Sequence, residues 1–390
     1  MKTNKNFKIT PFHKWLVGFT DGDGSFYIKK NDKWIAFFLG YHLVKDDVIC
    51  INKIKEGLNL DQKIEVRQKS VILAIKKHSV ILNTVIPIFD NYPLITKKGN
   101  VYTIWRESFI GYVNKSKNRD ELLAMKYKLN DANFLNLLPD ILNFKHISTE
   151  YIVGFLEAEG SFVLSRNRNA CEFYISQHKN SIYLLEAIKQ YIINEWKPIN
   201  STPKLINKYL LDNWDDIVHL TKPNKHGIVN LYITNIDFLN YVVVPYLESV
   251  LWYSKKHQDY LDWKSVIKLY IGGYHKTYPD VLDYIKHVIL NSNRKRWNST
   301  SQYDINIINN ILCQLPIYDL RCLYRANSVG YKFGGLLGVY VYDLNNKLLR
   351  VFSGTVPAAS HFNCTKQEIS KFIKNNIPFK SLYLLSSKYK

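Results

Sequence analysis

The sequence of 390 residues has few cysteines, few acidic residues relative to basic ones, and no long apolar run. Its five cysteines form no CxxC pair and no cluster with histidine at zinc spacing, so we expect neither a structural zinc nor a disulfide framework. No apolar stretch approaches the roughly 18 residues that span a bilayer, and the first residues show no import signal. These features predict a protein of a reducing compartment with no membrane partner.

Basic residues are abundant instead. There are 53 Lys and Arg against 33 Asp and Glu, a formal net charge of +20. An excess of this size favours a polyanionic partner, and its spread through folded segments favours nucleic acid over an anionic membrane. The 46% hydrophobic content predicts a folded chain, and the length suits two or three domains. The richness in Lys, Asn, Ile and Tyr hints at an AT-rich organellar genome.

An acidic motif with glycine occurs twice. Residues 15–28 read WLVGFTDGDGSFYI and residues 151–164 read YIVGFLEAEGSFVL, with six of fourteen positions identical. An EF-hand calcium loop is excluded, because Phe19 and Lys30 stand where that loop needs acidic ligands. A second block, around the Lys-Lys pairs at 97–98 and 255–256, repeats in the same order. The chain therefore contains two copies of one domain.

The periodicity within each copy predicts a helix ending at the motif, a strand pair, a helix, a second strand pair and further helices, which is an α+β fold. In the first copy we expect strands at 25–29, at 34–39 and within 64–75. The second copy has matching segments, such as NLYITNI at 230–236. One face of each sheet is expected to be apolar and covered by helices, and the other to be polar and basic.

Each motif helix carries two small residues four positions apart: Gly18 and Gly22 in the first, Gly154 and Ala158 in the second. Small residues at this spacing allow two helices to approach closely, so we expect the motif helices to pack together. Asp23 and Glu159 would then meet at the helix C-termini. Two carboxylates at the negative ends of two helix dipoles are unfavourable unless a cation is bound. The pattern favours Mg²⁺ and phosphodiester cleavage.

The sequences LVGFTDGDG and IVGFLEAEG resemble the two motifs of a double-motif LAGLIDADG homing endonuclease of the kind that organellar introns encode. The resemblance covers roughly residues 10–270. It implies two pseudo-twofold-related αββαββα subdomains with saddle-shaped antiparallel sheets. It also implies a mitochondrial monomer that uses Mg²⁺, with Mn²⁺ able to substitute, to cut both strands of a long asymmetric DNA site.

The resemblance also implies which residues form the site. Asp23 and Glu159 correspond to the catalytic, metal-binding acids, with backbone carbonyls of Gly22 and Ala158 as further metal ligands; Lys98 and Lys256 correspond to the basic residue beside each acid, and Gln177 to a solvent-orienting residue. Lys97 and Lys255 stay open as alternatives within each pair. The first copy has no polar counterpart of Gln177, which leaves the solvent network lopsided. We expect Asp21 and Glu157 to be structural.

The C-terminal residues form a separate unit. The stretch VYVYDLNNKLLRVF predicts two strands, and the following segment predicts a helix-turn-helix whose second helix begins with a capping box of Thr365 and Glu368. The unit resembles the modular DNA-binding domains found beside homing nucleases. Candidate DNA contacts are Lys29, Lys33, Arg67, Lys69, Arg166 and Arg168 on the sheets, and Lys366, Gln367, Ser370, Lys371 and Lys374 on the recognition helix.

These observations predict five segments: a first subdomain at 1–114, a connector at 115–147, a second subdomain at 148–271, a basic helical linker at 272–335 and the modular domain at 336–390. One alternative function stays open, an RNA maturase that binds its host group I intron, with or without DNA cleavage. A protein that only nicks DNA is a lesser alternative, because the acids are an Asp and a Glu.

Overall fold

The computed structural model describes residues 7–131, 146–165, 170–202, 207, 210–272, 283–284, 339–352 and 354–387. Arg166, Arg168 and nearly all of the predicted linker at 272–335 lie outside these ranges. The chain divides into two compact units, residues 1–261 and 262–390, and each is described by itself. The domain boundaries inferred from the sequence stay predictions. No helix within the described ranges is long and apolar enough to cross a membrane.

Both motif helices run directly into a strand. Helix α1 (Pro11–Asp23) begins with a capping box in which Thr10 and His13 exchange hydrogen bonds, and it continues without a gap into β1 (Gly24–Lys30). Helix α7 (Thr149–Glu159) begins at Ser148, whose hydroxyl accepts a hydrogen bond from the Tyr151 amide, and continues into β5 (Gly160–Ser165). The second acid of each motif is therefore the last helical residue before a sheet begins.

Each copy contains a four-stranded antiparallel sheet. The first has the order β1-β2-β4-β3, with β2 at Ile35–Val44, β3 at Glu65–Val66 and β4 at Ser70–Ile75. The second has the order β5-β6-β8-β7, with β6 at Ala170–His178, β7 at His219–Leu220 and β8 at Ile228–Ile233. The matching strand orders confirm the predicted α+β fold of two copies. Strand β2 is longer than the predicted strand at 34–39.

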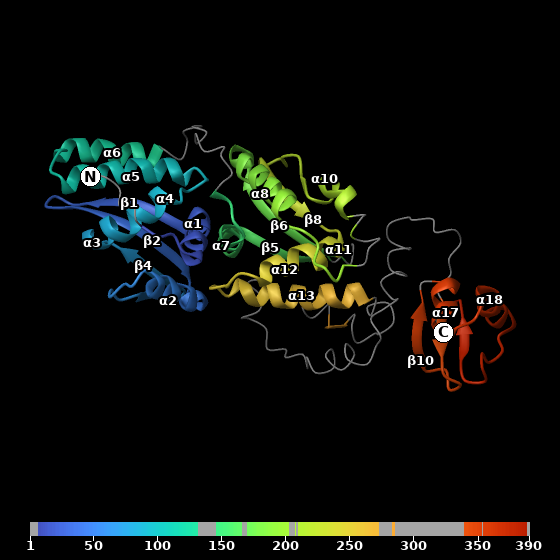
Figure 1. Ribbon diagram of the computed structural model, residues 1–390. Helices are drawn as coiled ribbons and strands as arrows, with labels where there is room; N and C mark the ends of the chain where they lie inside the picture. The colour runs from blue at the N-terminus through green and yellow to red at the C-terminus, as the bar shows by residue number, and fades with distance from the viewer. Residues whose placement is uncertain are drawn as a thin grey trace. The chain divides into compact units, whose positions relative to one another are not determined.

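Helices cover one face of each sheet. In the first copy they are η1 (Lys45–Asp47), α2 (Val48–Gly57), α3 (His78–Val80), η2 (Ile81–Val85), α4 (Ile86–Asn91), α5 (Lys98–Val113) and α6 (Arg119–Asp131). In the second copy they are η4 (Lys179–Ser181), α8 (Ile182–Glu195), α10 (Trp214–Ile217), α11 (Ile236–Phe238), η5 (Leu239–Val243), α12 (Val244–Glu248) and α13 (Lys256–Gly272). Helices α5 and α6 lie side by side along the first sheet (Figure 1).

The core of the first copy lies between its sheet and α5, where the rings are fully buried. Trp105 and Phe109 of α5 stack at a centroid distance of 5.8 Å, and Phe26 and Phe37 of the sheet contact them. In the second copy Phe162 of β5 packs on Tyr260 of α13. The burial of these aromatic side chains and of the other apolar residues around them is the main stabilising contribution to each copy. It also fixes α5 and α13, the helices that carry the Lys-Lys pairs, against the sheets.

The C-terminal unit, drawn in orange to red in Figure 1, contains β9 (Val339–Tyr342), β10 (Leu348–Phe352), α17 (Thr355–Phe362), α18 (Lys366–Asn375) and β11 (Leu384–Ser386). The predicted strands, helices and capping box of Thr365 and Glu368 are present. Strand β11 was not predicted, because three residues carry too little periodicity; it pairs with β9 to complete a sheet of order β10-β9-β11. Asn363 and Asn376, both left-handed, end the two helices.

Candidate active site and nucleic-acid interface

The motif helices α1 and α7 contact each other at their glycines. A Cβ atom added to Gly18 would lie 2.1 Å from the carbonyl oxygen of Tyr151, and one added to Gly154 would lie 2.1 Å from that of Trp15. Both obstacles are backbone atoms, so only glycine permits this approach. A Cβ added to Gly22 would lie 3.2 Å from Cγ of Glu159. The predicted helix contact is therefore present, and it places the ends of the two motifs side by side.

Asp21, the first acid of the first motif, is buried and accepts several hydrogen bonds. The backbone amides of Ile95 and Thr96 donate to it at 2.8 and 3.1 Å, and the hydroxyl of Tyr151 from the other motif helix donates at 2.7 Å. Burial raises the pKa of Asp21, while these donors favour its charged form. The carboxylate thus ties α1 to the loop before α5 and to α7.

Glu157, the first acid of the second motif, ties α7 to the loop before α13 and to α1. The amides of Tyr253 and Ser254 donate to it at 2.9 and 2.5 Å, and the indole of Trp15 on the other motif helix also donates. Burial raises the pKa of Glu157 to about 7. Asp21 and Glu157 hold the Lys-Lys loops in place, and these contacts fit the structural role expected for both.

Asp23 and Glu159 differ from Asp21 and Glu157, because both reach the solvent although protein atoms surround part of each carboxylate. Surrounding protein atoms and then the charge of Glu159 raise the pKa of Asp23 to about 6. Partial burial also raises the pKa of Glu159, against the charges of Lys98 and Lys256. The negative charge of Glu159 thus disfavours the charged form of Asp23, an effect that a bound cation would oppose.

The second lysine of each Lys-Lys pair reaches back to the end of its own motif helix. The ammonium of Lys98 donates to the carbonyl oxygen of Thr20 at 3.1 Å and also to that of Gly22. The ammonium of Lys256 donates to the carbonyl oxygen of Gly160 at 3.0 Å. Burial lowers the pKa of Lys98. The structure thus brings Lys98 and Lys256 to the two acids, and a cation that used the Gly22 carbonyl would share it with Lys98.

Gln177, the predicted solvent-orienting residue, makes no hydrogen bond to the two acids or the two lysines in the described part of the chain. It lies on β6 opposite Val229. The register assigns its counterpart in the first copy to Leu43, which lies opposite Val71 on β2 and is buried. At equivalent places the first copy therefore has a buried leucine and the second copy a glutamine.

The candidate metal ligands are all oxygen atoms. The described residues contain no group of three or more His, Cys, Asp or Glu side chains that could hold a metal ion. Two carboxylates, carbonyl oxygens and coordination positions left for water or phosphate suit a hard cation such as Mg²⁺ or Ca²⁺ better than zinc. Burial and, second to it, the charge of Glu159 raise the pKa of Asp23, and a bound cation would offset both effects. The residues present therefore fit a divalent cation.

The open face of the first sheet carries a pair of stacked aromatic rings beside a lysine. Tyr27 and Phe38 stack on it at a centroid distance of 5.0 Å, with the ammonium of Lys29 above both rings. The other predicted contacts lie in turns: Lys33 between β1 and β2, Arg67 and Lys69 between β3 and β4. Arg67 forms an ion pair of 2.7 Å with Glu65. The expectation that Arg67 and Lys69 lie on the sheet was wrong, because β3 ends at Val66 and both residues belong to the turn that follows it.

The open face of the second sheet is also aromatic. Tyr174 and Tyr232 stack at 5.2 Å, and the Tyr174 hydroxyl donates to the buried carboxylate of Glu172 at 2.6 Å. Residues 148–271 contain 13 Lys and Arg against 13 Asp and Glu, whereas residues 1–114 contain 18 against 10. The basic excess of the repeat is therefore confined to the first copy.

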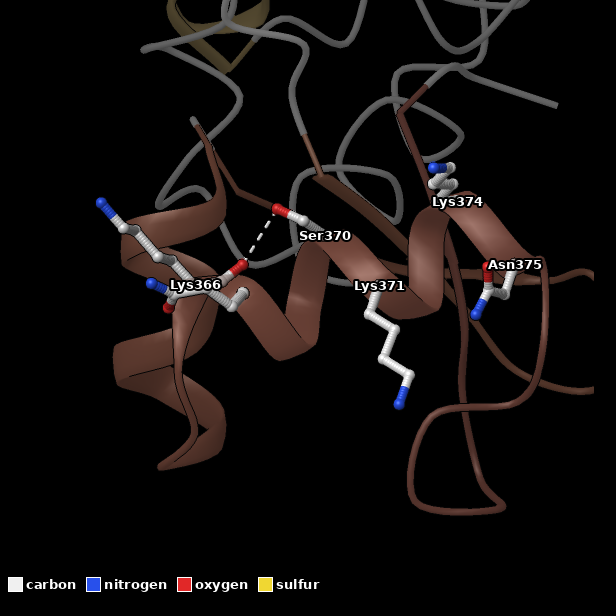
Figure 2. A pocket seen from close by; sticks show the side chains of 6 residues that line it. Lys366, Ser370, Lys371, Lys374 and Asn375 are labelled. Atoms are coloured by element: carbon white, nitrogen blue, oxygen red, sulfur yellow. Dashed lines mark hydrogen bonds between the residues drawn. The ribbon is translucent and has the colours of Figure 1, made fainter.

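Helix α18 of the C-terminal unit presents an exposed polar face. Lys366, Gln367, Ser370, Lys371 and Lys374, the residues predicted for the recognition helix, all line it together with Asn375. Figure 2 shows the lysine side chains extending away from the helix, with the Ser370 hydroxyl donating to the Lys366 carbonyl at 2.9 Å. Ile369 is buried on the opposite side. This face fits the grooved, negatively charged surface of a nucleic acid.

Comparison with known proteins agrees with this arrangement of paired acidic helices on two sheets. The sequence model described as LAGLIDADG endonuclease matches residues 16–109 and again 152–267, and the NUMOD1 domain matches residues 337–373. The chain belongs to the LAGLIDADG endonuclease family and carries a C-terminal NUMOD1 domain.

Two relatives illustrate the similarity. An uncharacterized mitochondrial protein, RF1, of Saccharomyces cerevisiae is 41% identical over 98% of this chain and 83% of its own length. The probable intron-encoded endonuclease Cox1-I1b of Schizosaccharomyces pombe is 28% identical over 50% of this chain and 52% of its own length.

Solved structures share the fold at low identity. The LAGLIDADG homing endonuclease I-GzeII in complex with its DNA target matches with a TM-score of 0.59 and 19% identity, covering 74% of this chain and all of that one. The structure of I-SmaMI bound to uncleaved DNA in the presence of calcium ions matches with a TM-score of 0.58 and 19% identity, over 73% of this chain and all of that one.

Proposed function

We propose that this protein is a site-specific, Mg²⁺-dependent homing endonuclease that cuts both strands of a long asymmetric DNA site and so mobilises its intron. The observation that carries the proposal is the convergence of Asp23 and Glu159 with Lys98 and Lys256 at the contact of the two motif helices. Two acids and two lysines in pseudo-symmetric places suit two hydrolytic half-sites, one for each DNA strand. Since one chain supplies both halves, we propose a monomer.

The chemistry follows from these four side chains. A bound divalent cation would polarise the phosphate and lower the pKa of attacking water. Asp23 and Glu159 would hold that cation with backbone carbonyl oxygens of Gly22 and Ala158 nearby. Lys98 and Lys256 each donate a hydrogen bond to a carbonyl oxygen of their motif. There they would stabilise negative charge on the phosphate or exchange a proton with solvent. The lowered pKa of Lys98 suits proton exchange.

Two features suit the long DNA site. The two sheets, one in each copy, offer two surfaces for two dissimilar half-sites. The lysine face of α18 offers a third contact, in which Lys366, Lys371 and Lys374 would neutralise phosphates and Gln367 and Ser370 would reach base edges. A mitochondrial location is supported by the name of the Saccharomyces cerevisiae relative.

A second candidate function is binding of the host group I intron RNA. The observation that favours it is the pair of stacked aromatic groups on the open faces, Tyr27 with Phe38 and Tyr174 with Tyr232. Aromatic rings on the open face of a sheet, here half-buried, are a common platform for unpaired RNA bases, which a DNA duplex does not offer. DNA binding would use the open faces of the same two sheets, so the two nucleic acids would compete for these surfaces.

The deciding experiment is selection of cleaved sequences from a randomised duplex DNA library with Mg²⁺. The wild-type protein should enrich one long site, and Asp23→Asn should enrich none while still binding that site. The matched control is Asp46→Asn, because Asp46 is an exposed carboxylate of the same copy. If the wild-type protein enriches nothing, the nuclease proposal is wrong. Selective binding to a structured group I intron would then support the RNA function.

A further inference from the structure

A third carboxylate from the first copy reaches the start of α13, which belongs to the second. Asp47, the last residue of η1, accepts a hydrogen bond from the backbone amide of Lys255 at 2.8 Å. The two residues are 208 positions apart. Lys255 immediately precedes Lys256, the lysine proposed for the second half-site. The contact thus crosses from one copy to the other beside the candidate active site.

The start of α13 is held by three successive acceptors. The amide of Ser254 donates to Glu157, that of Lys255 to Asp47, and that of Lys256 to the Ser254 hydroxyl at 3.2 Å. Amides at a helix N-terminus lack partners within the helix, and a carboxylate there is also favoured by the helix dipole. Asp47 therefore helps to fix the backbone from which the Lys256 side chain reaches Gly160.

The first half-site has no such carboxylate at the equivalent place. The short helices η1 and η4 follow β2 and β6 in the same way, and their last residues are Asp47 and Ser181. A serine offers neither the charge nor the reach of an aspartate. Together with Leu43 standing where the second copy has Gln177, this makes the two halves chemically unequal.

We propose that Asp47 is a positioning residue for Lys256, so that the half-site of Glu159 and Lys256 depends on a carboxylate from the other copy. The inference rests on the proposed nuclease function for its consequence in cleavage, although not for the anchoring itself. Loss of the anchor should displace Lys256 and slow only the strand that this half-site cuts. A displacement near 1 Å can reduce a rate by about a hundredfold, so we expect a loss of at least about tenfold.

The cleavage test measures nicking of each strand of the selected duplex separately, in single turnover. Lys256→Met and Lys98→Met identify which strand each half-site cuts. Asp47→Ser should slow the Lys256 strand at least about tenfold and leave the other strand and DNA affinity unchanged. Asp47→Asn, which keeps an acceptor oxygen, should recover most of the rate, and the exposed Asp46→Ser should match wild type. Equal slowing of both strands, or no slowing, would overturn the proposal.

The anchoring is measured without cleavage by amide hydrogen exchange. Asp47→Ser should raise exchange at residues 253–258 and leave residues 94–100, at the start of α5, as in wild type. Asp46→Ser should change neither segment. Unchanged protection at 253–258 would overturn the positioning role even if the wild-type protein cuts DNA. If the protein cuts no DNA but this segment loses protection, the nuclease proposal fails and the anchor stands.

Discussion

The contact between the motif helices predicts a large effect from a single methyl group. In Gly154→Ala the new Cβ would stand 2.1 Å from the Trp15 carbonyl oxygen, about 1.2 Å inside the roughly 3.3 Å of a close carbon–oxygen contact. The nearest atoms, the Trp15 carbonyl and the Phe19 amide, are backbone, so only a separation of the helices relieves the overlap.

The free energy of unfolding should fall as a result. Overpacking a core typically costs about 1–3 kcal/mol, and an obstacle of backbone atoms places this variant at the upper end. Replacing a helical glycine by alanine returns about 1 kcal/mol of helix propensity. We therefore expect a net loss of about 2 kcal/mol or more, together with loss of cleavage, because Asp23 and Glu159 move apart.

The matched control is Gly111→Ala. Gly111 is also buried within a helix, α5, but its added Cβ would meet only side-chain carbons of Lys117, which can move. This variant should gain up to about 1 kcal/mol. Urea unfolding of both variants checks the difference, which should be about 3 kcal/mol. If Gly154→Ala stays within about 0.5 kcal/mol of Gly111→Ala, the inferred helix contact is wrong.

Other predictions test the carboxylates and the C-terminal helix. In urea unfolding, Asp21→Ala should lower the free energy of unfolding by about 3 kcal/mol or more, because it leaves buried hydrogen-bond donors without a partner. Asp46→Ala, at the surface, should change the free energy of unfolding by less than about 0.5 kcal/mol. Calcium affinity, measured by calorimetry, should fall as the pH drops through about 6, because protonation of Asp23 removes ligand charge. The Asp23→Asn variant should bind calcium weakly at every pH. A calcium affinity of the wild-type protein that does not depend on pH would contradict the assignment of Asp23 as a ligand. Lys371→Ala and Lys374→Ala should each reduce the slope of log affinity against log salt for the selected duplex by about 1, and unchanged slopes would remove α18 from the interface.

Much of the fold follows from local pattern and repetition. The spacing of Gly18 and Gly22 on a helix surface is fixed by the helical period, and its recurrence at Gly154 and Ala158 predicts the contact of α1 with α7 without knowledge of the rest. The capping box likewise involves only Thr365 and Glu368, which are three positions apart. Such features depend on neighbours in sequence, and the repeat indicates which distant segments are equivalent.

The surfaces were harder to predict. The alternation of Glu65, Arg67 and Lys69 indicates a strand with a basic face. In the structure β3 ends at Val66, so Arg67 and Lys69 lie in the turn that follows it. Sheet alternation states which side chains share a face and leaves open where a short strand ends. The neutral charge of residues 148–271 is visible in the sequence once the copies are counted separately.

The sequence by itself determined the two copies, the paired acids Asp23 and Glu159 and the class of fold, because each of these rests on local periodicity repeated along one chain. Only the tertiary structure decided which lysine of each pair faces its motif, how Asp21 and Glu157 hold the Lys-Lys loops, and that Asp47 anchors Lys255. Those contacts join residues that are 74 to 208 positions apart, and no local pattern encodes the orientation in which two distant segments meet.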